Sequence, residues 1–298
     1  MKAKPNQRDL FKKWNLAHRF KQVPETIIHS TYLGSSSLDR NSTTRLDKGL
    51  CRMLSRKPTH PSRSIKVLSW NIAKNNYNPN WSKEFLVIMD RYQPDKIFLQ
   101  EVRLRADERE IPELAKMGWT FAPNFIDTSN NTYSGVLIAS QDDRIKSQAM
   151  TTKHYEPIIN TPKVSLFTEY FLANNSKILA VNTHLINFVS LPKFKAQLEE
   201  IESILSIYKE AIILAGDFNA WNKSRWRLLY KMATRLNLTP VSFIAEDTKK
   251  IKSFLLSPPL DYIFHRGLKQ KPNTAKVIDN ISSSDHNPLF VELCLNKD

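Results

Sequence analysis

Polar side chains stand at the ends of apolar runs at several points along this 298-residue chain. Because the part of a strand that faces a core is normally apolar, a carboxylate, amide or imidazole at its end requires an explanation. In α/β proteins, ligands bind beyond the ends of strands, so these side chains form one candidate site if the strand ends meet. The side chains are Asn71, Gln100 and Glu101, Asn182 and His184, Asp217 and Asn219, Asp261, and Asp285 and His286.

The residue types at these ends indicate phosphoester chemistry. Asparagine, glutamate and aspartate offer hard oxygen ligands, and no cysteine stands near them, which favours Mg²⁺ or Mn²⁺ over zinc. A hard divalent ion neutralises charge on a phosphate oxygen during hydrolysis, while histidine and aspartate transfer protons and stabilise charge. A single strand-end aspartate or histidine is usually structural, so the prediction depends on the ordered set.

Short apolar runs that alternate with helical periods begin at Ile65 and predict layers of strands and helices. Strands are predicted over residues 66–73, 96–102, 134–140, 163–172, 177–186, 211–219, 261–265 and 288–295. Helices are predicted over residues 192–209 and 223–236. In the second helix, Trp226 and Leu229 lie on the apolar face, whereas Arg225 lies largely off it.

Six motifs that contain these side chains together resemble the endonuclease/exonuclease/phosphatase superfamily, which has the DNase I-like fold. They occur in the family's order: W-N at 70–71, Q-E at 100–101, N-T-H-L at 182–185, G-D-F-N at 216–219, L-D-Y at 260–262 and S-D-H-N-P at 284–288. The resemblance covers about residues 65–296. Residues 216–221 and 259–268 are most similar to the bacterial YafD-like branch of the superfamily.

The resemblance implies a fold and a metal site. The fold is a two-sheet α/β sandwich with outer helices, and the active site lies at one edge of the sandwich. Glu101 is then the principal Mg²⁺ ligand, Asn71 helps to hold the metal or its water, and Asp285 is a further ligand. Mn²⁺ is an alternative ion, and the number of metals stays open.

The resemblance also implies roles in proton transfer. Asp217 orients or deprotonates the attacking water, and Asn219 positions that water and binds phosphoryl oxygens. His286, held by Asp261 as a His-Asp pair, and His184 stabilise the transition state or transfer protons. A carboxylate partner fixes the histidine tautomer and favours the imidazolium. Which residue acts as the general base stays open.

The substrate is predicted to be a phosphoester, with nucleic acid favoured. The net charge is +15, and residues 1–64 hold 14 Lys and Arg against 4 Asp and Glu, a distribution that indicates an anionic partner. Trp221 and Arg225 combine an aromatic ring with a cation beside Asn219, as stacking and phosphate contacts require. Asn182 is a third candidate for substrate contact, and Arg225 has the alternative of being a solvated surface residue.

Two other functions remain open because fold does not determine substrate. A sphingomyelinase-like phosphodiesterase would act on phospholipid, and the basic segment would then bind an anionic membrane surface. A non-catalytic phosphate-binding module would lack a metal-binding or proton-handling residue, and none is missing. No protein partner is predicted.

Charge divides the chain into a basic arm and linker, residues 1–64, and a catalytic domain, residues 65–298. Leu10, Trp14 and Ala17 recur at helical spacing in the arm, and residues 34–64 have the composition of a linker. No apolar run reaches the length of a membrane-spanning helix or a secretion signal. Because Cys51 and Cys294 form no disulfide framework, we expect a cytoplasmic protein.

Overall fold

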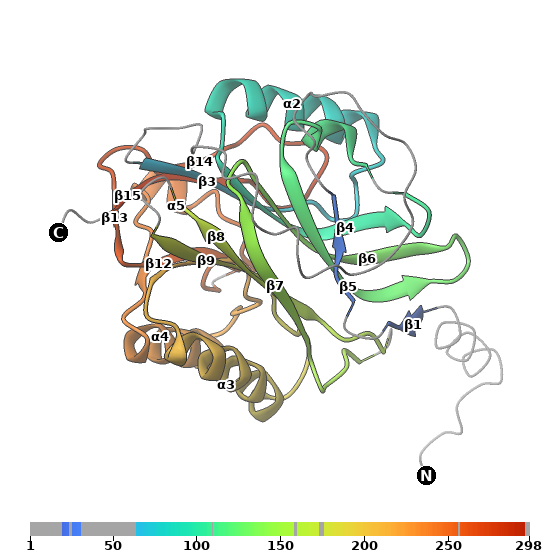
Figure 1. Cartoon of the computed structure of the whole chain (residues 1–298). Helices are drawn as coiled ribbons and strands as arrows, with labels where there is room; N and C mark the ends of the chain where they lie inside the picture. Colours follow the sequence, from blue (N-terminus) through green and yellow to red (C-terminus); the bar gives the residue numbers. More distant parts are fainter. Residues whose placement is uncertain are drawn as a thin grey trace, which may run out of the picture.

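Two β-sheets packed face to face form the centre of the chain, with helices on their outer faces (Figure 1). The structure is a computed structural model that describes residues 20–23, 26–30, 64–108, 110–157, 160–172, 176–255 and 257–295. The predicted two-sheet α/β sandwich is confirmed. No described helix is both long and apolar enough to cross a membrane.

The first sheet contains nine strands among the described residues, in the order β1-β5-β6-β4-β3-β15-β13, with β2 paired to β5 and β14 to β15. Its strands β3 and β4 are parallel, and its other pairs are antiparallel. The bounds are β1 (Phe20–Gln22), β2 (Ile28–His29), β3 (Ser64–Asn71), β4 (Lys96–Arg105), β5 (Gly118–Asp127), β6 (Thr132–Ser140), β13 (Leu268–Gln270), β14 (Lys276–Val277) and β15 (Leu289–Leu295).

The second sheet contains six strands among the described residues, in the order β11-β12-β10-β9-β8-β7. Strand β10 runs parallel to β9 and antiparallel to β12, so β9 and β10 end at the edge where β12 begins. The bounds are β7 (Arg144–Thr151), β8 (Val164–Phe171), β9 (Lys177–His184), β10 (Ala211–Asp217), β11 (Thr239–Pro240) and β12 (Asp261–Arg266).

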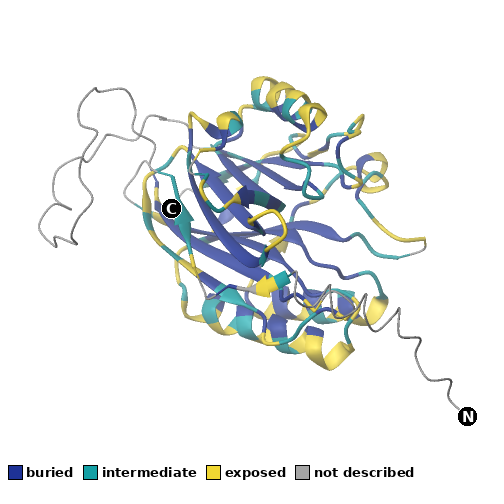
Figure 2. Cartoon of the chain, turned by 90° about the vertical axis from the view of Figure 1, so that its right-hand side faces the viewer, coloured by how far each residue is buried: buried dark blue, intermediate teal, exposed yellow. Residues whose placement is uncertain are grey.

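The helices bury apolar faces against the two sheets. Helix α2 (Pro79–Tyr92) places Trp81, Phe85 and Ile88 against the first sheet. Helices α3 (Leu191–Ile207) and α4 (Lys223–Arg235) cover the second sheet, and a third apolar cluster fills the space between the sheets. Figure 2 shows buried strands between helices whose outer faces are exposed. The short elements are η1 (Pro112–Leu114) and α5 (Ala245–Thr248).

All eight predicted strands and both predicted helices occur, with shifts at their ends. The prediction missed β5, β7, α2 and the short strands. Strands β1 and β2 fall within the predicted basic arm but pair with β5, so this part of the arm belongs to the sheet. The helix predicted around Trp14 and the linker before Ser64 lie outside the described residues.

Candidate active site

Three predicted residues lie side by side where the strands of the second sheet meet. Asp217, the last residue of β10, is in register with His184 on β9 and with Asp261 on β12. Gly216 allows this close approach, because its φ is +146° and a Cβ atom there would lie 1.9 Å from the Thr183 carbonyl oxygen. The row therefore depends on both the strand directions and the glycine.

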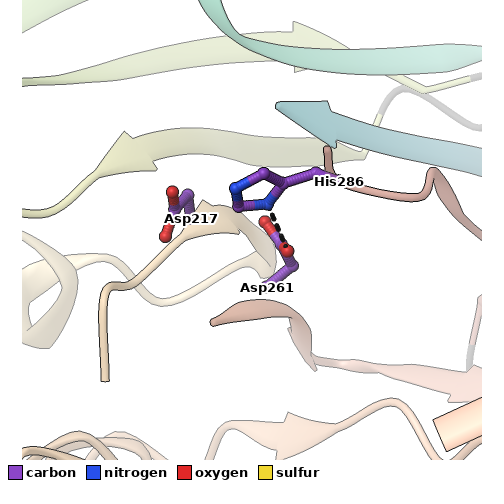
Figure 3. A group of neighbouring side chains, drawn as sticks. All are labelled: Asp217, Asp261 and His286. Carbon is purple, nitrogen blue, oxygen red and sulfur yellow. Dashed lines mark hydrogen bonds and ion pairs between the residues drawn. The ribbon is translucent and has the colours of Figure 1, made fainter. Parts of the chain in front are cut away.

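His286 joins this row from the loop that precedes β15. Its Nδ1 lies 2.7 Å from Asp261 Oδ2, and Figure 3 shows the imidazole between the Asp261 and Asp217 carboxylates. The loop is attached to β3 at two points: Trp70 Nε1 donates to the His286 carbonyl at 2.9 Å, and Ser284 Oγ donates to the Asn71 carbonyl at 2.7 Å. These bonds fix the position of the imidazole.

Burial and mutual charge shift the pKa values of this group. Burial, followed by the charge of Asp261, raises the pKa of Asp217 to about 7. Burial alone would lower the pKa of His286, but the charge and hydrogen bond of Asp261 outweigh it and raise that pKa to about 9. At neutral pH, His286 is therefore charged, and Asp217 is poised to accept a proton.

Two asparagines hold the Asp217 carboxylate. Asn71 Nδ2 donates to its Oδ2 at 3.0 Å, and the Asn219 backbone N–H donates to its Oδ1 at 3.0 Å. Asn219 has a left-handed φ of 46°, and its side-chain amide donates to the Leu185 carbonyl at 2.8 Å. The bonds from Asn71 and from the Asn219 N–H fix the orientation of the carboxylate, which has an oxygen within 4.8 Å of a His286 ring nitrogen.

Glu101 reaches the same edge through a β-bulge in β4. The register between β4 and β6 shifts between Leu99 and Val102, and Glu101 has a left-handed φ of 56°. A bulge can redirect a side chain in this way. The Glu101 Oε1 atom lies 4.0 Å from His184 Nε2, which is itself 3.5 Å from Asp217 Oδ2. Glu101 is thus next to the Asp217 group.

His184 stays neutral at this edge. It is buried, and burial, followed by the charges of Lys163, His286 and Lys74, lowers its pKa well below 6.5. A neutral imidazole can donate from one ring nitrogen and accept at the other.

The structure brings most of the predicted site together but leaves out Asp285. The side chains that converge are Asn71, Glu101, His184, Asp217, Asn219, Asp261 and His286. The Asp285 side chain is 62% exposed and its carboxylate pairs with Lys252 at 2.8 Å. In this structure Asp285 forms a surface ion pair, and its role as a metal ligand stays a prediction.

The predicted substrate contact of Asn182 is wrong, because this side chain is fully buried. Its Nδ2 donates to the carbonyls of Leu99 at 2.9 Å and Leu137 at 2.7 Å, and its Oδ1 accepts from Gln100 Nε2 at 2.7 Å. These partners belong to the opposite sheet. Asn182 therefore ties the two sheets together beneath the site.

Arg225 is also buried, so neither predicted role, substrate contact or solvated residue, applies to it. Its guanidinium donates to the carbonyls of Ile186 and Asn219 at 3.1 Å each and of Val189 at 2.8 Å. It lies over the half-buried Trp221 ring, 4.9 Å from the centroid. Arg225 thus positions the loops that carry Asn219, and a substrate contact by Trp221 stays a prediction.

Two supporting residues, Trp70 and Ser284, are not among the residues predicted from sequence. Both hold the His286 loop against β3. Trp70 precedes Asn71 in the W-N motif, and Ser284 precedes Asp285 and His286 in the S-D-H motif. Their places in these motifs are the sequence signal that could identify them.

Comparisons with known proteins indicate the family and the fold. The model of the Endonuclease/Exonuclease/phosphatase family matches residues 68–286. A UPF0294 protein of Vibrio campbellii is 32% identical over 241 residues, which cover 78% of each chain. The human Nocturnin catalytic domain with bound sulfate has a TM-score of 0.59 at 19% identity, covering 78% of this chain and 95% of that one. D. rerio TDP2 complexed with single strand DNA product has a TM-score of 0.54 at 14% identity, covering 77% and 98%.

Proposed function

The chain belongs to the endonuclease/exonuclease/phosphatase family, and we therefore propose that it is a divalent-metal-dependent phosphodiesterase that cleaves nucleic acid. The observation that carries the proposal is the buried group Asp217, Asp261 and His286 beside Glu101. The DNA product in the TDP2 relative supports nucleic acid as the substrate class.

Glu101 is suited to hold a divalent ion. Within the described residues, the nearest basic side chains to its carboxylate are Lys74, with Nζ at 3.7 Å, and neutral His184, with Nε2 at 4.0 Å, both beyond hydrogen-bond distance. The side chain is 23% exposed, so its oxygens are available to a hard cation such as Mg²⁺ or Mn²⁺. Asn71 Oδ1 accepts one bond, from the Ala73 N–H, and keeps a second lone pair for such an ion. When bound, the ion would supply positive charge to a phosphoryl oxygen.

The three side chains Asp217, Asp261 and His286 also meet a geometric requirement for a metal site, because their ligand atoms lie within 4.8 Å of one another. However, the raised pKa of His286, caused by Asp261 against the opposing effect of burial, favours a protonated imidazole at neutral pH. A protonated imidazole donates hydrogen bonds and does not bind a metal. We therefore assign His286 to proton transfer.

In the proposed reaction, Asp217 accepts a proton from the attacking water. Its carboxylate is held at both oxygens by Asn71 and Asn219. Its pKa of about 7, caused first by burial and then by Asp261, is close to the pH at which a general base is most effective. The charged His286 donates to the phosphoryl group, and neutral His184 adds a second hydrogen bond at the same edge.

A phospholipid is the second candidate substrate, favoured by the apolar residues around the site. Phe188, on the loop after β9, is 66% exposed, and Leu255, on the loop before β12, is 93% exposed. Both loops lie at the sheet edge that carries Asp217. Exposed apolar tips of this kind can enter the interfacial region of a membrane.

The experiment is hydrolysis of plasmid DNA, an abasic-site duplex, single-stranded RNA, phospholipid vesicles and bis(p-nitrophenyl) phosphate with Mg²⁺ and with EDTA. We expect cleavage of one or more nucleic acids, lost in EDTA and lowered at least about 100-fold by Asp217→Asn and by His286→Ala. The matched control is Asp279→Asn, a surface carboxylate that is 49% exposed. Cleavage of vesicles alone would select the lipid candidate, and full activity of a folded Asp217→Asn protein would refute the site.

A further inference from the structure

A small hollow opens beside Glu101 and His184, between the two sheets. Lys74, Lys163, Asn124 and Thr161 line it together with these two residues. Its volume of about 20 Å³ accommodates one group the size of a water molecule. A base or a sugar is therefore too large for the hollow.

The strands that form the hollow are shaped to aim polar groups into it. The bulge in β4 redirects Glu101, and a second register shift, between Pro123 and Phe125 of β5, leaves Asn124 outside the ladder. Asn124 is buried, and its amide donates to the Pro162 carbonyl at 2.7 Å. Strands β4 and β5 both pair with β6, and a bulge in each of them beside one hollow indicates a constructed site, because bulges commonly redirect side chains beside active sites.

Lys74 is held at the mouth of the hollow by backbone and side-chain contacts. Its backbone N–H donates to the Glu101 carbonyl at 3.0 Å in a left-handed conformation with φ of 63°. Its Nζ lies 3.7 Å from Glu101 Oε2 and 5.9 Å from the centroid of the Phe125 ring. These contacts are long, so the ammonium keeps donors for another partner.

Lys163 provides the second cation and is anchored more firmly. Its side chain is only 12% exposed, and its Nζ lies 3.4 Å from Glu156 Oε2. Glu156 is itself fixed, because its Oε1 accepts from the Asn187 N–H at 2.9 Å. One carboxylate oxygen leaves further N–H groups of Lys163 for a ligand.

We propose that this hollow is an oxyanion pocket in which Lys74 and Lys163 bind a non-bridging oxygen of the scissile phosphate. The inference rests on the proposed phosphodiesterase function and adds two catalytic residues to it. A phosphoryl oxygen matches the hollow in size and in charge, and its negative charge grows as water attacks phosphorus. Lys74 balances Glu101 and Lys163 balances Glu156, so the oxygen enters a region without net repulsion.

The test compares Lys74→Met and Lys163→Met with Lys153→Met in two measurements. Lys153 stands on the same loop as Lys163, but its side chain is 82% exposed and pairs with Glu200. The first measurement is kcat on bis(p-nitrophenyl) phosphate with Mg²⁺. We expect it to fall about 100-fold in either pocket variant, as for loss of an oxyanion donor, and to stay within about twofold in Lys153→Met. The second is calorimetric binding of inorganic phosphate, expected to weaken at least about tenfold in the pocket variants alone.

The two measurements separate this proposal from the proposed function. Unchanged phosphate affinity in folded Lys74→Met would overturn the pocket, even if the wild-type protein hydrolyses diesters. If the wild-type protein hydrolyses none, the phosphate measurement still decides. Lys163→Met could leave Glu156 unpaired and unfold the protein, so Lys74→Met, at a 36% exposed side chain, is the decisive variant. Lys163→Arg keeps the charge but is too bulky for the hollow, and full activity of this variant would also overturn the proposal.

Discussion

Replacing Asn182 by alanine should destabilise the protein strongly, although sequence alone suggests a residue in contact with substrate. The side chain is completely buried and makes three hydrogen bonds to the first sheet, to Leu99, Leu137 and Gln100. Leu99 and Leu137 are the last residues in register before the β4 bulge interrupts the ladder. Asn182 therefore satisfies carbonyls at the point where the ladder breaks to admit Glu101.

The size of the effect follows from the groups left without partners. A buried polar group that loses its hydrogen bond costs about 1–3 kcal/mol, so two orphaned carbonyls give a loss of about 2–6 kcal/mol. Gln100 keeps weaker partners, the Phe98 carbonyl at 3.2 Å and Ser69 Oγ at 3.5 Å, and adds little. Since the free energy of unfolding of a folded protein is about 5–15 kcal/mol, Asn182→Ala should remove a large part of it.

The assay is urea denaturation of the wild-type protein, Asn182→Ala and the control Asn130→Ala. Asn130 is exposed, so its substitution should change the free energy of unfolding by no more than about 0.5 kcal/mol. If Asn182→Ala lowers the free energy of unfolding by less than about 1 kcal/mol, which is the smallest cost of an orphaned carbonyl, the role of Asn182 in joining the two sheets is refuted. Unchanged stability with a raised KM would support the substrate contact instead.

Three further predictions concern other parts of the site. Gly216→Ala places a Cβ atom 1.9 Å from the Thr183 carbonyl oxygen, so we expect a loss of about 3 kcal/mol or more, or failure to fold, in a denaturation series. Arg225→Met leaves three carbonyls without a donor and should lower the denaturation midpoint by several degrees; a raised KM at normal stability would contradict this. The pKa of His286 is raised from 6.5 to about 9, because Asp261 outweighs burial, so its stabilising contribution is complete below pH 6.5 and is lost as the pH rises through about 9. The difference in unfolding free energy between the wild-type protein and His286→Gln should therefore shrink over that pH range from at most about 3 kcal/mol, and a pH-independent difference would contradict it.

Three of the reacting groups, His184, Asp217 and Asp261, could be predicted from sequence because each ends or begins a strand. Asp217 and His184 end parallel neighbours, and Asp261 begins the antiparallel partner, so strand directions alone bring them into one row. His286 follows no strand, and its position depends on Trp70 and Ser284, whose contacts cross more than half the chain. Only the co-occurrence of the motifs indicated that it joins the row.

Neither the bulges in β4 and β5 nor the burial of Arg225 could be predicted from the sequence. A bulge leaves no periodic trace, because one inserted residue resembles an ordinary strand end, and so the turn of Glu101 and Asn124 toward the hollow is visible only in the structure. Arg225 is charged and lies largely off the apolar face of its helix, so the sequence predicts a solvated residue. It is buried because the loops around Asn219 present three carbonyls to it, and loop geometry does not follow from helical periodicity.

The period of two along a strand explains why the sequence predicts a substrate contact for Asn182. Asn182 and His184 point to the same face of β9, but Asn182 lies one pleat deeper, about 7 Å from the edge residue. The same relation holds on β3, where Ser69 lies beneath Asn71, and Gln100 bridges Ser69 and Asn182. This lower polar row joins the sheets directly beneath the reacting row. The same strands carry both rows, so loss of a hydrogen bond in the lower row should displace the reacting groups in the upper row. Substitution of Asn182 should therefore lower activity through Glu101 and His184, although it removes no group that touches substrate.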